Sequence, residues 1–302
     1  MAISDNMRGA GLMMAAMAGF TLNDAFMKAV TQTLPLYQAI FLRGLLTLAL
    51  LVPLAHVTGG LRLTLPRADR RLVGLRSVAE IGATVLFLTA LMHMPLANLS
   101  AILQSLPLAV TLGAALFLGE PVGWRRLSAI LIGFAGVLLI VRPGSADFNI
   151  WALAGVGAVA CVVLRDLSTR RMSSALPSVT VAIYAAATVM LLGAAMTPFG
   201  GWSPVGPGEA GYLAAAAVCL VMGYVFIVSA ARTGDIGTVA PFRYTALLWA
   251  IGLGWLVFGD FPDPLTLAGA AIVVATGIYT FHRERRLGRV AAAMPTRAPP
   301  PR

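Results

Sequence analysis

Apolar stretches of about 20 residues recur along almost the whole chain, and no other feature restricts the fold as strongly. The first five cover about 8–30, 35–56, 72–94, 96–118 and 126–142. The second five cover about 148–168, 177–199, 209–231, 236–259 and 262–282. Each is long enough to cross a bilayer as a helix, and only 11% of all residues are charged, against about 25% in soluble domains. We therefore predict an all-α integral membrane protein with ten transmembrane helices.

Arginine residues are divided unevenly between the two ends of the predicted helices. One side receives Arg8, Arg62, Arg67, Arg70, Arg71, Arg125, Arg126, Arg170, Arg171, Arg232, Arg283, Arg285, Arg286 and Arg289. The opposite side receives Arg142, and its loop "TPFGGWSPVGPGEAG" contains no Lys or Arg. Because cytoplasmic loops collect basic residues, we expect both termini in the cytoplasm. The net charge of +10 then reflects topology, and we expect no nucleic-acid partner.

Two segments resemble each other over a helix, a Gly-acid turn and a second helix. The first is "LANLSAILQSLPLAVTLGAALFLGEPVGWRRLSAILIGFAGVLLIV" and the second is "IGTVAPFRYTALLWAIGLGWLVFGDFPDPLTLAGAAIVVATGIYTF". Asp24 with Lys28 likewise matches Asp166 with Arg170. Chance similarity between two apolar segments is the alternative explanation. A repeat of five spans would place its two copies upside down, which is a transporter architecture with a substrate site near the midplane.

The repeat predicts three parts of the chain. We expect an N-terminal repeat at 1–145, a C-terminal inverted repeat at 146–285, and a disordered cytoplasmic tail at 286–302, where Pro and Ala dominate.

The same segments resemble the drug/metabolite transporter superfamily, in its ten-helix EamA branch. The resemblance rests on "LQSLPLAVTLGAALFLGEPVGWRRLSAILIGFAGVLLIV" and "APFRYTALLWAIGLGWLVFGDFP", and it covers about 10–282. Pro107 and Glu120 stand where the family has a helix-four proline and a loop glutamate, whereas Asp260 replaces a frequent Glu. The resemblance implies a basket of ten helices and alternating access across the bacterial inner membrane. It also implies export of amino acids, aromatic ones included, or of other small metabolites.

Charged residues inside the apolar stretches are candidates for a substrate site, because each costs about 2.5–3.5 kcal/mol at the centre of a helix. Asp24 lies about 9 Å and Arg43 about 12 Å from the same membrane face, so the two side chains are close enough in depth to meet. Lys28 follows Asp24 by one turn and is expected near the interface as a structural or gating residue. The alternative to a substrate site is a structural pair in which Asp24 neutralises Arg43.

Glu80 and Arg243 form a second predicted pair, each about 12 Å from the cytoplasmic face. An amino acid is a zwitterion, so a carboxylate would bind its ammonium group and a guanidinium its carboxylate. Asp166 and Arg170 are expected at a cytoplasmic helix end, where they are candidates for gating.

Polar and aromatic residues add further candidates. Gln104 lies mid-helix, one turn before Pro107, and is expected to bind substrate, although helix packing is the commoner role for such a residue. Pro107 and Pro241 free backbone carbonyls at membrane depth, which is tolerated where the carbonyls line a cavity. Five aromatic residues are candidates for an aromatic wall, and the alternative for each is helix packing or a place in the interfacial belt: Trp249, Tyr244, Phe242, Tyr224 and Tyr184.

Three classes of function follow from these observations. The leading class is a secondary transporter that exports amino acids. The alternative is a transporter for another class of molecule, such as nucleosides or cationic drugs. A membrane-embedded enzyme is least favoured, because the sequence lacks HExxH, GxSxG and Walker A motifs. We expect no cofactor and no metal, a small-molecule substrate, the lipid bilayer as surroundings, and a functional monomer.

Overall fold

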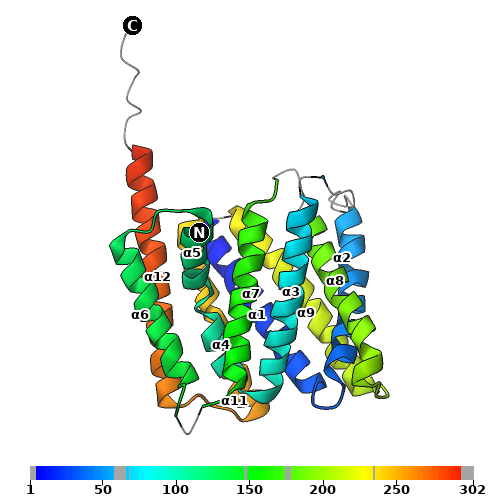
Figure 1. Cartoon of the computed structure of the whole chain (residues 1–302). Coiled ribbons are helices and arrows are strands. Elements are labelled where there is room, and N and C mark those ends of the chain that lie inside the picture. Colours follow the sequence, from blue (N-terminus) through cyan, green and yellow to red (C-terminus); the bar gives the residue numbers. More distant parts are fainter. Residues whose placement is uncertain are drawn as a thin grey trace.

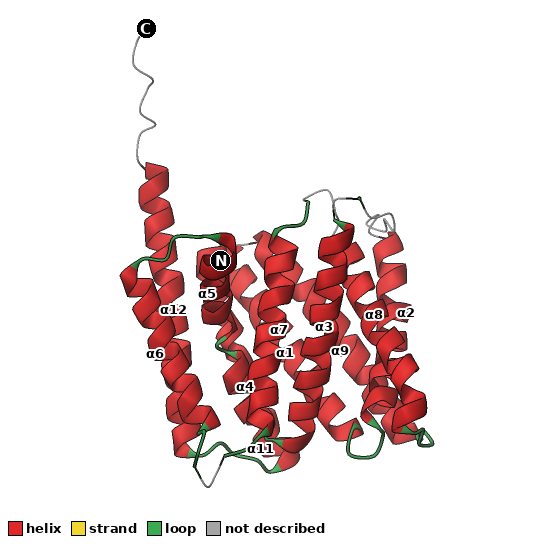
Figure 2. Ribbon diagram, viewed as in Figure 1, coloured by secondary structure: helices red, strands yellow, loops and turns green. Residues whose placement is uncertain are grey.

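The computed structural model describes residues 5–57, 66–67, 69–145, 148–173, 178–233 and 235–293. The helices of the first half are α1 (Asp5–Val30), α2 (Leu36–Val57), α3 (Arg70–His93), α4 (Leu96–Leu103), α5 (Leu106–Leu118) and α6 (Trp124–Val141). Those of the second half are α7 (Trp151–Arg170), α8 (Ser178–Gly200), α9 (Pro207–Thr233), α10 (Ile236–Val239), the 3₁₀ helix η1 (Ala240–Tyr244), α11 (Thr245–Phe258) and α12 (Pro264–Ala293). None of the described residues forms a β-strand, and Figure 2 shows red helices and green loops without yellow.

The helices match the predicted spans closely. Nine spans of the described chain are long and apolar enough to cross a membrane, which makes this a multi-pass membrane protein. The remaining helix, α1, is 26 residues long, and its polar Asn23, Asp24 and Lys28 lower its mean hydropathy. Two of the nine spans are interrupted, one between α4 and α5 and the other at η1.

The interrupted spans end in the same way. The C-cap of α5 is Gly119 and that of α11 is Gly259, with φ angles of 70° and 72°. Both lie in the left-handed region, which glycine enters without a steric penalty. The predicted Gly-acid turns are therefore helix C-caps of one geometry.

The helices pack in pairs that combine the two halves of the chain. α1 packs along α9, α3 along α7, α2 along α8, and α6 along α12. In Figure 1 the α6–α12 pair stands at the left edge and the α2–α8 pair at the right edge, with the other two pairs between them. The middle of the molecule is therefore enclosed by helices from both halves.

Two of these pairs make very close backbone contacts at glycine. A Cβ atom on Gly19 of α1 would lie 2.9 Å from the carbonyl oxygen of Cys219 in α9. A Cβ on Gly136 of α6 would lie 2.8 Å from the carbonyl oxygen of Gly269, and one on Gly269 would lie 2.5 Å from the carbonyl oxygen of Gly136. Only glycine permits these distances, as is common between membrane helices.

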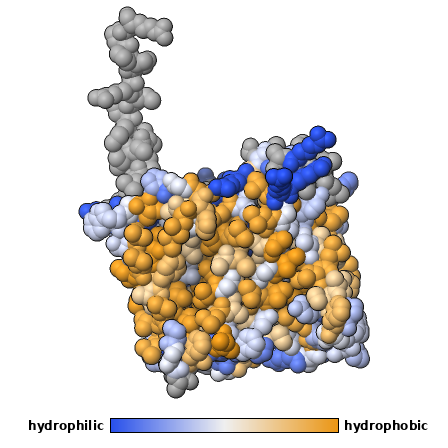
Figure 3. Space-filling model, in the orientation of Figure 1, coloured by the Kyte–Doolittle hydropathy of each residue, from blue (hydrophilic) through white to orange (hydrophobic). Residues whose placement is uncertain are grey.

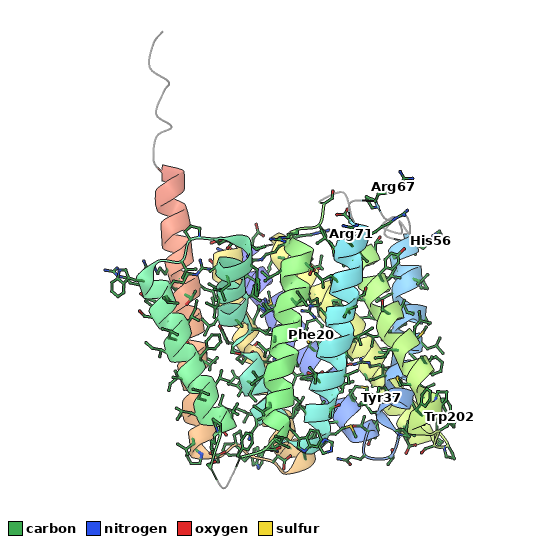
Figure 4. All side chains as sticks on the ribbon, viewed as in Figure 1. Phe20, Tyr37, His56, Arg67, Arg71 and Trp202 are labelled. Carbon is green, nitrogen blue, oxygen red and sulfur yellow. The ribbon has the colours of Figure 1, made fainter. Side chains whose placement is uncertain are left out.

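The surface has an apolar belt between two more hydrophilic rims (Figure 3). Arg67 and Arg71 lie at one rim, and Tyr37 and Trp202 lie at the other (Figure 4). We call the first the arginine-rich end and the second the Trp202 end. α1 begins and α12 finishes at the arginine-rich end (Figure 1). Arg142, at the Trp202 end, is paired with Asp263.

The last helix is longer than predicted. α12 continues to Ala293, so the tail expected to be disordered from 286 is helical at its start. The run from 285 to 293 consists mostly of Arg, Leu and Ala, which are strong helix formers. Residues 294–302, like Arg62 in an earlier loop, lie outside the described residues.

Candidate functional site

A cavity of about 260 Å³ lies between the central helix pairs, among residues near the middle of α1, α2, α3, α7, α8 and α9. Its polar lining consists of Asn23, Asp24, Arg43, Thr47, Glu80, Thr84, Arg165 and Tyr224. Three of the seven residues predicted to bind substrate therefore meet in one cavity, namely Asp24, Arg43 and Glu80. Buried charges in a membrane protein are expected to face such a space or one another.

Asp24 and Arg43 are connected through Asn23. Nη1 of Arg43 donates to Oδ1 of Asn23 at 3.3 Å, and Nδ2 of Asn23 donates to Oδ1 of Asp24 at 2.9 Å. Within the described part of the chain, Asp24 and Arg43 form no direct ion pair, and Nε of Arg43 has no hydrogen-bond partner. Arg43 is buried and lines the cavity, and its Nε is free of any protein hydrogen bond among the described residues.

Glu80 has different partners from the one predicted. Its carboxylate lies 3.4 Å from Arg76 on the same helix and 3.4 Å from Arg165 on α7. The predicted pair with Arg243 is not formed, because α3 packs on α7 and this contact brings Arg165 to Glu80. Arg243 is exposed within η1, and its electrostatic partner is Asp166.

The charged side chains become more exposed from the cavity toward the arginine-rich end. The exposed fraction is 12% for Glu80, 27% for Arg165, 37% for Asp166 and 50% for Arg170. Nε of Arg165 lies 2.9 Å from Asp166, and Nη1 of Arg170 lies 3.4 Å from Glu120. Asp166 thus ends a chain of ion pairs that begins at Glu80 in the cavity, and Arg170 forms a separate, more exposed pair with Glu120.

The Trp202 end of the molecule is closed by apolar side chains. These residues, at the ends of α1 and α3 and the starts of α2 and α4, are at most 2% exposed: Met27, Val30, Ile40, Leu91, Leu96 and Leu99. They belong to one large hydrophobic core. The cavity is therefore separated from the Trp202 end by a packed layer.

Lys28 lies beside this packed layer, where it lines a second cavity together with His93, Phe258 and Asp260. Its Nζ atom donates to the carbonyl oxygens of Leu91 at 3.2 Å and Met94 at 2.6 Å, at the C-terminal end of α3. The same ammonium lies 5.4 Å from the ring centroid of Phe258 in α11. A cation is favourable at a helix C-terminus, and here it also connects three helices.

The two interrupted spans are connected by Gln104. Nε2 of this buried residue, in the break between α4 and α5, donates to the carbonyl oxygen of Tyr244 at 3.0 Å. Pro107 occupies the first turn of α5 and Pro241 lies in η1, so each proline marks a break. Gln104 is not part of the cavity lining, and the structure therefore places it in helix packing.

Of the five residues proposed for an aromatic wall, Tyr224 of α9 lines the cavity and the other four do not. Trp249 is 45% exposed on the outside of α11, and Tyr244 is buried, with its ring 6.4 Å from that of Phe281. Asn23 and Arg165 also line the cavity, although neither residue was predicted to belong to the substrate site. The repeat contains a signal for both, because Asn23-Asp24 aligns with Arg165-Asp166.

Comparisons with known proteins agree with this architecture. The profile of the EamA-like transporter family matches residues 7–142 and 149–281, one range in each half. The pseudopaline exporter CntI of Pseudomonas aeruginosa is 29% identical over 89% of this chain and 94% of its own length. A riboflavin transporter of Vibrio cholerae is 32% identical over 63% of each chain. An S-adenosylmethionine uptake transporter of Rickettsia conorii is 22% identical over 94% of this chain and 96% of its own length.

A solved crystal structure shares the fold. It superposes with a TM-score of 0.60 at 21% identity and covers 90% of this chain and 98% of the other. The family profile matches most of the chain, and its relatives are named as transporters of small molecules. The chain belongs to the EamA-like transporter family of the drug/metabolite transporter superfamily and is a small-molecule transporter.

Proposed function

We propose that this chain exports amino acids, aromatic ones included, across the bacterial inner membrane as a secondary transporter. One observation carries the proposal: one cavity between the helices holds a carboxylate, Asp24, and a guanidinium, Arg43, that do not neutralise each other directly. A zwitterion brings the two missing partners at once. Its ammonium group would bind Asp24, and its carboxylate would bind the guanidinium of Arg43.

Glu80 has a different role in this proposal. Its carboxylate already faces Arg76 and Arg165, so it offers less to a cationic group than Asp24 does. We assign Glu80 and Arg165 to holding α3 against α7 beside the cavity. The binding pair is then Asp24 and Arg43, both in the first half of the chain.

Alternating access fits the pairing of the helices. Exchange of the two halves converts the α1–α9 pair into the α7–α3 pair and leaves the α2–α8 and α6–α12 pairs unchanged. The same exchange of halves interchanges Gly119 and Gly259, which are both glycine caps in the left-handed region. These features support an inverted five-plus-five repeat, in which rocking of the halves exposes a fixed site to each side in turn.

The orientation follows from charge. The arginine-rich end is assigned to the cytoplasm, together with both termini, because cytoplasmic loops collect Arg and Lys. The conformation described here, which is packed at the Trp202 end, then faces the cytoplasm and is ready to load a substrate for export.

The names of the relatives include both export and uptake, so the direction of transport is a separate part of the proposal. S-adenosylmethionine carries the amino and carboxylate groups of methionine, which agrees with a site for a zwitterion. Riboflavin is not an amino acid, and the relative named for it makes other metabolites the alternative substrate class.

Counterflow in proteoliposomes tests the proposal. Proteoliposomes that contain the purified protein are preloaded with each of the twenty amino acids in turn. Entry of the same compound in radiolabelled form is then measured, with riboflavin, nucleosides and cationic drugs as competitors. We expect counterflow of at least one amino acid, and a decrease of about 10- to 150-fold in Arg43→Gln, because a hydrogen bond to a charged group contributes about 1.5–3 kcal/mol.

Arg125→Gln is the matched control, because Arg125 is exposed at the start of α6 and lies outside the cavity. Its transport should equal that of the wild type. Absence of counterflow for every amino acid, together with transport of a competitor, would assign the protein to the alternative class.

A further inference from the structure

The helices contribute unequally to the cavity wall. α1 and α2 contribute the polar residues Asn23, Asp24, Arg43 and Thr47. α3 contributes both kinds, with Glu80 and Thr84 beside Phe87 and Leu88, whereas α8, which packs along α2, contributes only Ala185, Ala186 and Val189. The cavity is therefore amphipathic, and α8 forms an entirely apolar part of its wall.

Other helices add further apolar residues to the lining. Ala158 and Val162 of α7 and Leu220 of α9 line the same space, as do Leu103 and Leu106 at the break between α4 and α5. Arg165 and Tyr224 are the polar residues that the second half of the chain adds within the described residues, and Arg165 is paired with Glu80 and Asp166. The second half thus supplies mostly hydrocarbon to the site.

Small side chains make room on this wall. Ala185 and Val189 lie one turn apart on the same face of α8 and are 5% and 7% exposed. Across from α8, Gly44 of α2 lies so close to Met190 that a Cβ atom would be 2.7 Å from its Cβ. α8 is therefore held tightly against α2. The space beside Ala185 exists because the alanine side chain is small, and not because the two helices are far apart.

We propose that α8 forms the subsite for the apolar side chain of the transported molecule, and that Ala185 and Val189 determine which side chains fit. The assignment rests on the proposed function, in which Asp24 and Arg43 hold the amino and carboxylate groups. It narrows the substrate class to zwitterions with an apolar substituent. Polar side chains of similar size would lose hydration against this wall without gaining hydrogen bonds.

Leucine and asparagine are suitable probes, because their side chains are similar in size and differ in polarity. We expect the wild-type protein to transport leucine at least about 10-fold more efficiently than asparagine, measured as counterflow kcat/KM. One methylene in an apolar pocket changes specificity by about 10- to 200-fold, so side-chain size gives the sharper test.

Two variants change the size of the subsite in opposite directions. Ala185→Phe fills it, and we expect transport of phenylalanine to fall at least about 10-fold more than transport of alanine. Val189→Ala enlarges it, and we expect transport of tryptophan to rise relative to that of leucine. Leu191→Phe is the matched control, because Leu191 is 60% exposed on the outside of the same helix, and its substrate ratios should equal those of the wild type.

The outcomes separate the two levels of the proposal. If the wild type transports amino acids but both variants change all substrates equally, the α8 subsite is wrong and the proposed function stands. The same holds if asparagine is transported as well as leucine. If the wild type transports no amino acid, the proposed function fails and this assignment fails with it. A variant that does not fold leaves the other variant and the leucine–asparagine ratio to decide.

Discussion

Asp24 on α1 and Asp166 on α7 stand at matching positions of the two halves, yet their surroundings differ. Each accepts a hydrogen bond of 2.9 Å from the residue before it, Asn23 in one case and Arg165 in the other. Asparagine is neutral and arginine is charged, so Asp166 is neutralised by its own neighbour and Asp24 is not. In the proposed function, the same position is a binding group in one half, whereas in the other half it belongs to a chain of ion pairs.

The residues one turn further along extend this comparison. Lys28 donates to two carbonyl groups at the end of α3 beside the packed layer, whereas Arg170 is half exposed and faces Glu120. One end of the cavity is therefore closed and the other is accessible to water. In an inverted repeat this difference describes a conformation, and the opposite conformation would exchange the two environments.

The largest expected effect separates the two aspartates by transport. Asp24→Asn should lower amino acid counterflow at least about 100-fold, because it removes a charge that faces the bound ammonium group. Asp166→Asn should lower it less than about 5-fold, because Arg165 retains its contact with Glu80. Counterflow at saturating substrate measures both. Equal losses in the two variants would contradict the division of roles.

The second effect concerns stability. Glu80→Gln leaves Arg76 and Arg165 without their shared carboxylate and should lower the free energy of unfolding by about 3 kcal/mol, the lower range for a broken buried ion pair. Asp24→Asn should change it by less than about 1 kcal/mol, since no cation among the described residues is paired directly with Asp24. Thermal unfolding in detergent compares the two variants. A larger loss in Asp24→Asn would reverse their roles.

A third, smaller effect tests the closed end. Lys28→Ala removes two charge-assisted hydrogen bonds, which should make opening at the Trp202 end about 10-fold more frequent. The measurement is thiol labelling of Val30→Cys in a variant in which Cys161 and Cys219 are replaced by alanine. Arg170→Ala in the same background is the control and should not accelerate labelling. Unchanged labelling in Lys28→Ala would show that packing alone closes this end.

The smallest effect compares the two helix pairs beside the cavity. A Cβ on Gly19 meets the backbone of α9, whereas a Cβ on Gly82 of α3 meets the side-chain sulfur of Cys161 at 2.9 Å. Gly19→Ala should therefore lower stability by about 1–3 kcal/mol, and Gly82→Ala by less, because a side chain moves more easily than a backbone. The melting temperatures of the two variants measure this difference. A lower melting temperature for Gly82→Ala than for Gly19→Ala would contradict the expectation.

Much of the fold was predictable because the bilayer imposes a simple rule on span length. The breaks in two spans were also predictable, since Pro107 and Pro241 stand beside them. The rotation of each helix about its axis was not predictable, and it decides which side chains face the cavity. Trp249 and Tyr224 show this: the first lies on the outside of α11, and the second lines the cavity.

The partners of the charges could not be derived from depth alone. Glu80 and Arg243 were matched by their distance from one membrane face, but α3 packs on α7, and Arg165 reaches Glu80 instead. Asp166, the residue after Arg165, was assigned to a helix end, whereas α7 continues for four more residues, to Arg170. The alignment of Asn23-Asp24 with Arg165-Asp166 in the repeat is the sequence signal that places Arg165 at the cavity.

The contact of Gly136 with Gly269 has a mechanical consequence. Because the two backbones are in contact without side chains between them, neither helix can tilt or slide independently of the other. α6 and α12 must therefore move as one rigid unit. Any rearrangement that turns the cavity from one side of the membrane to the other must therefore bend elsewhere, and the two broken spans joined by Gln104 and Tyr244 are the joints available for it.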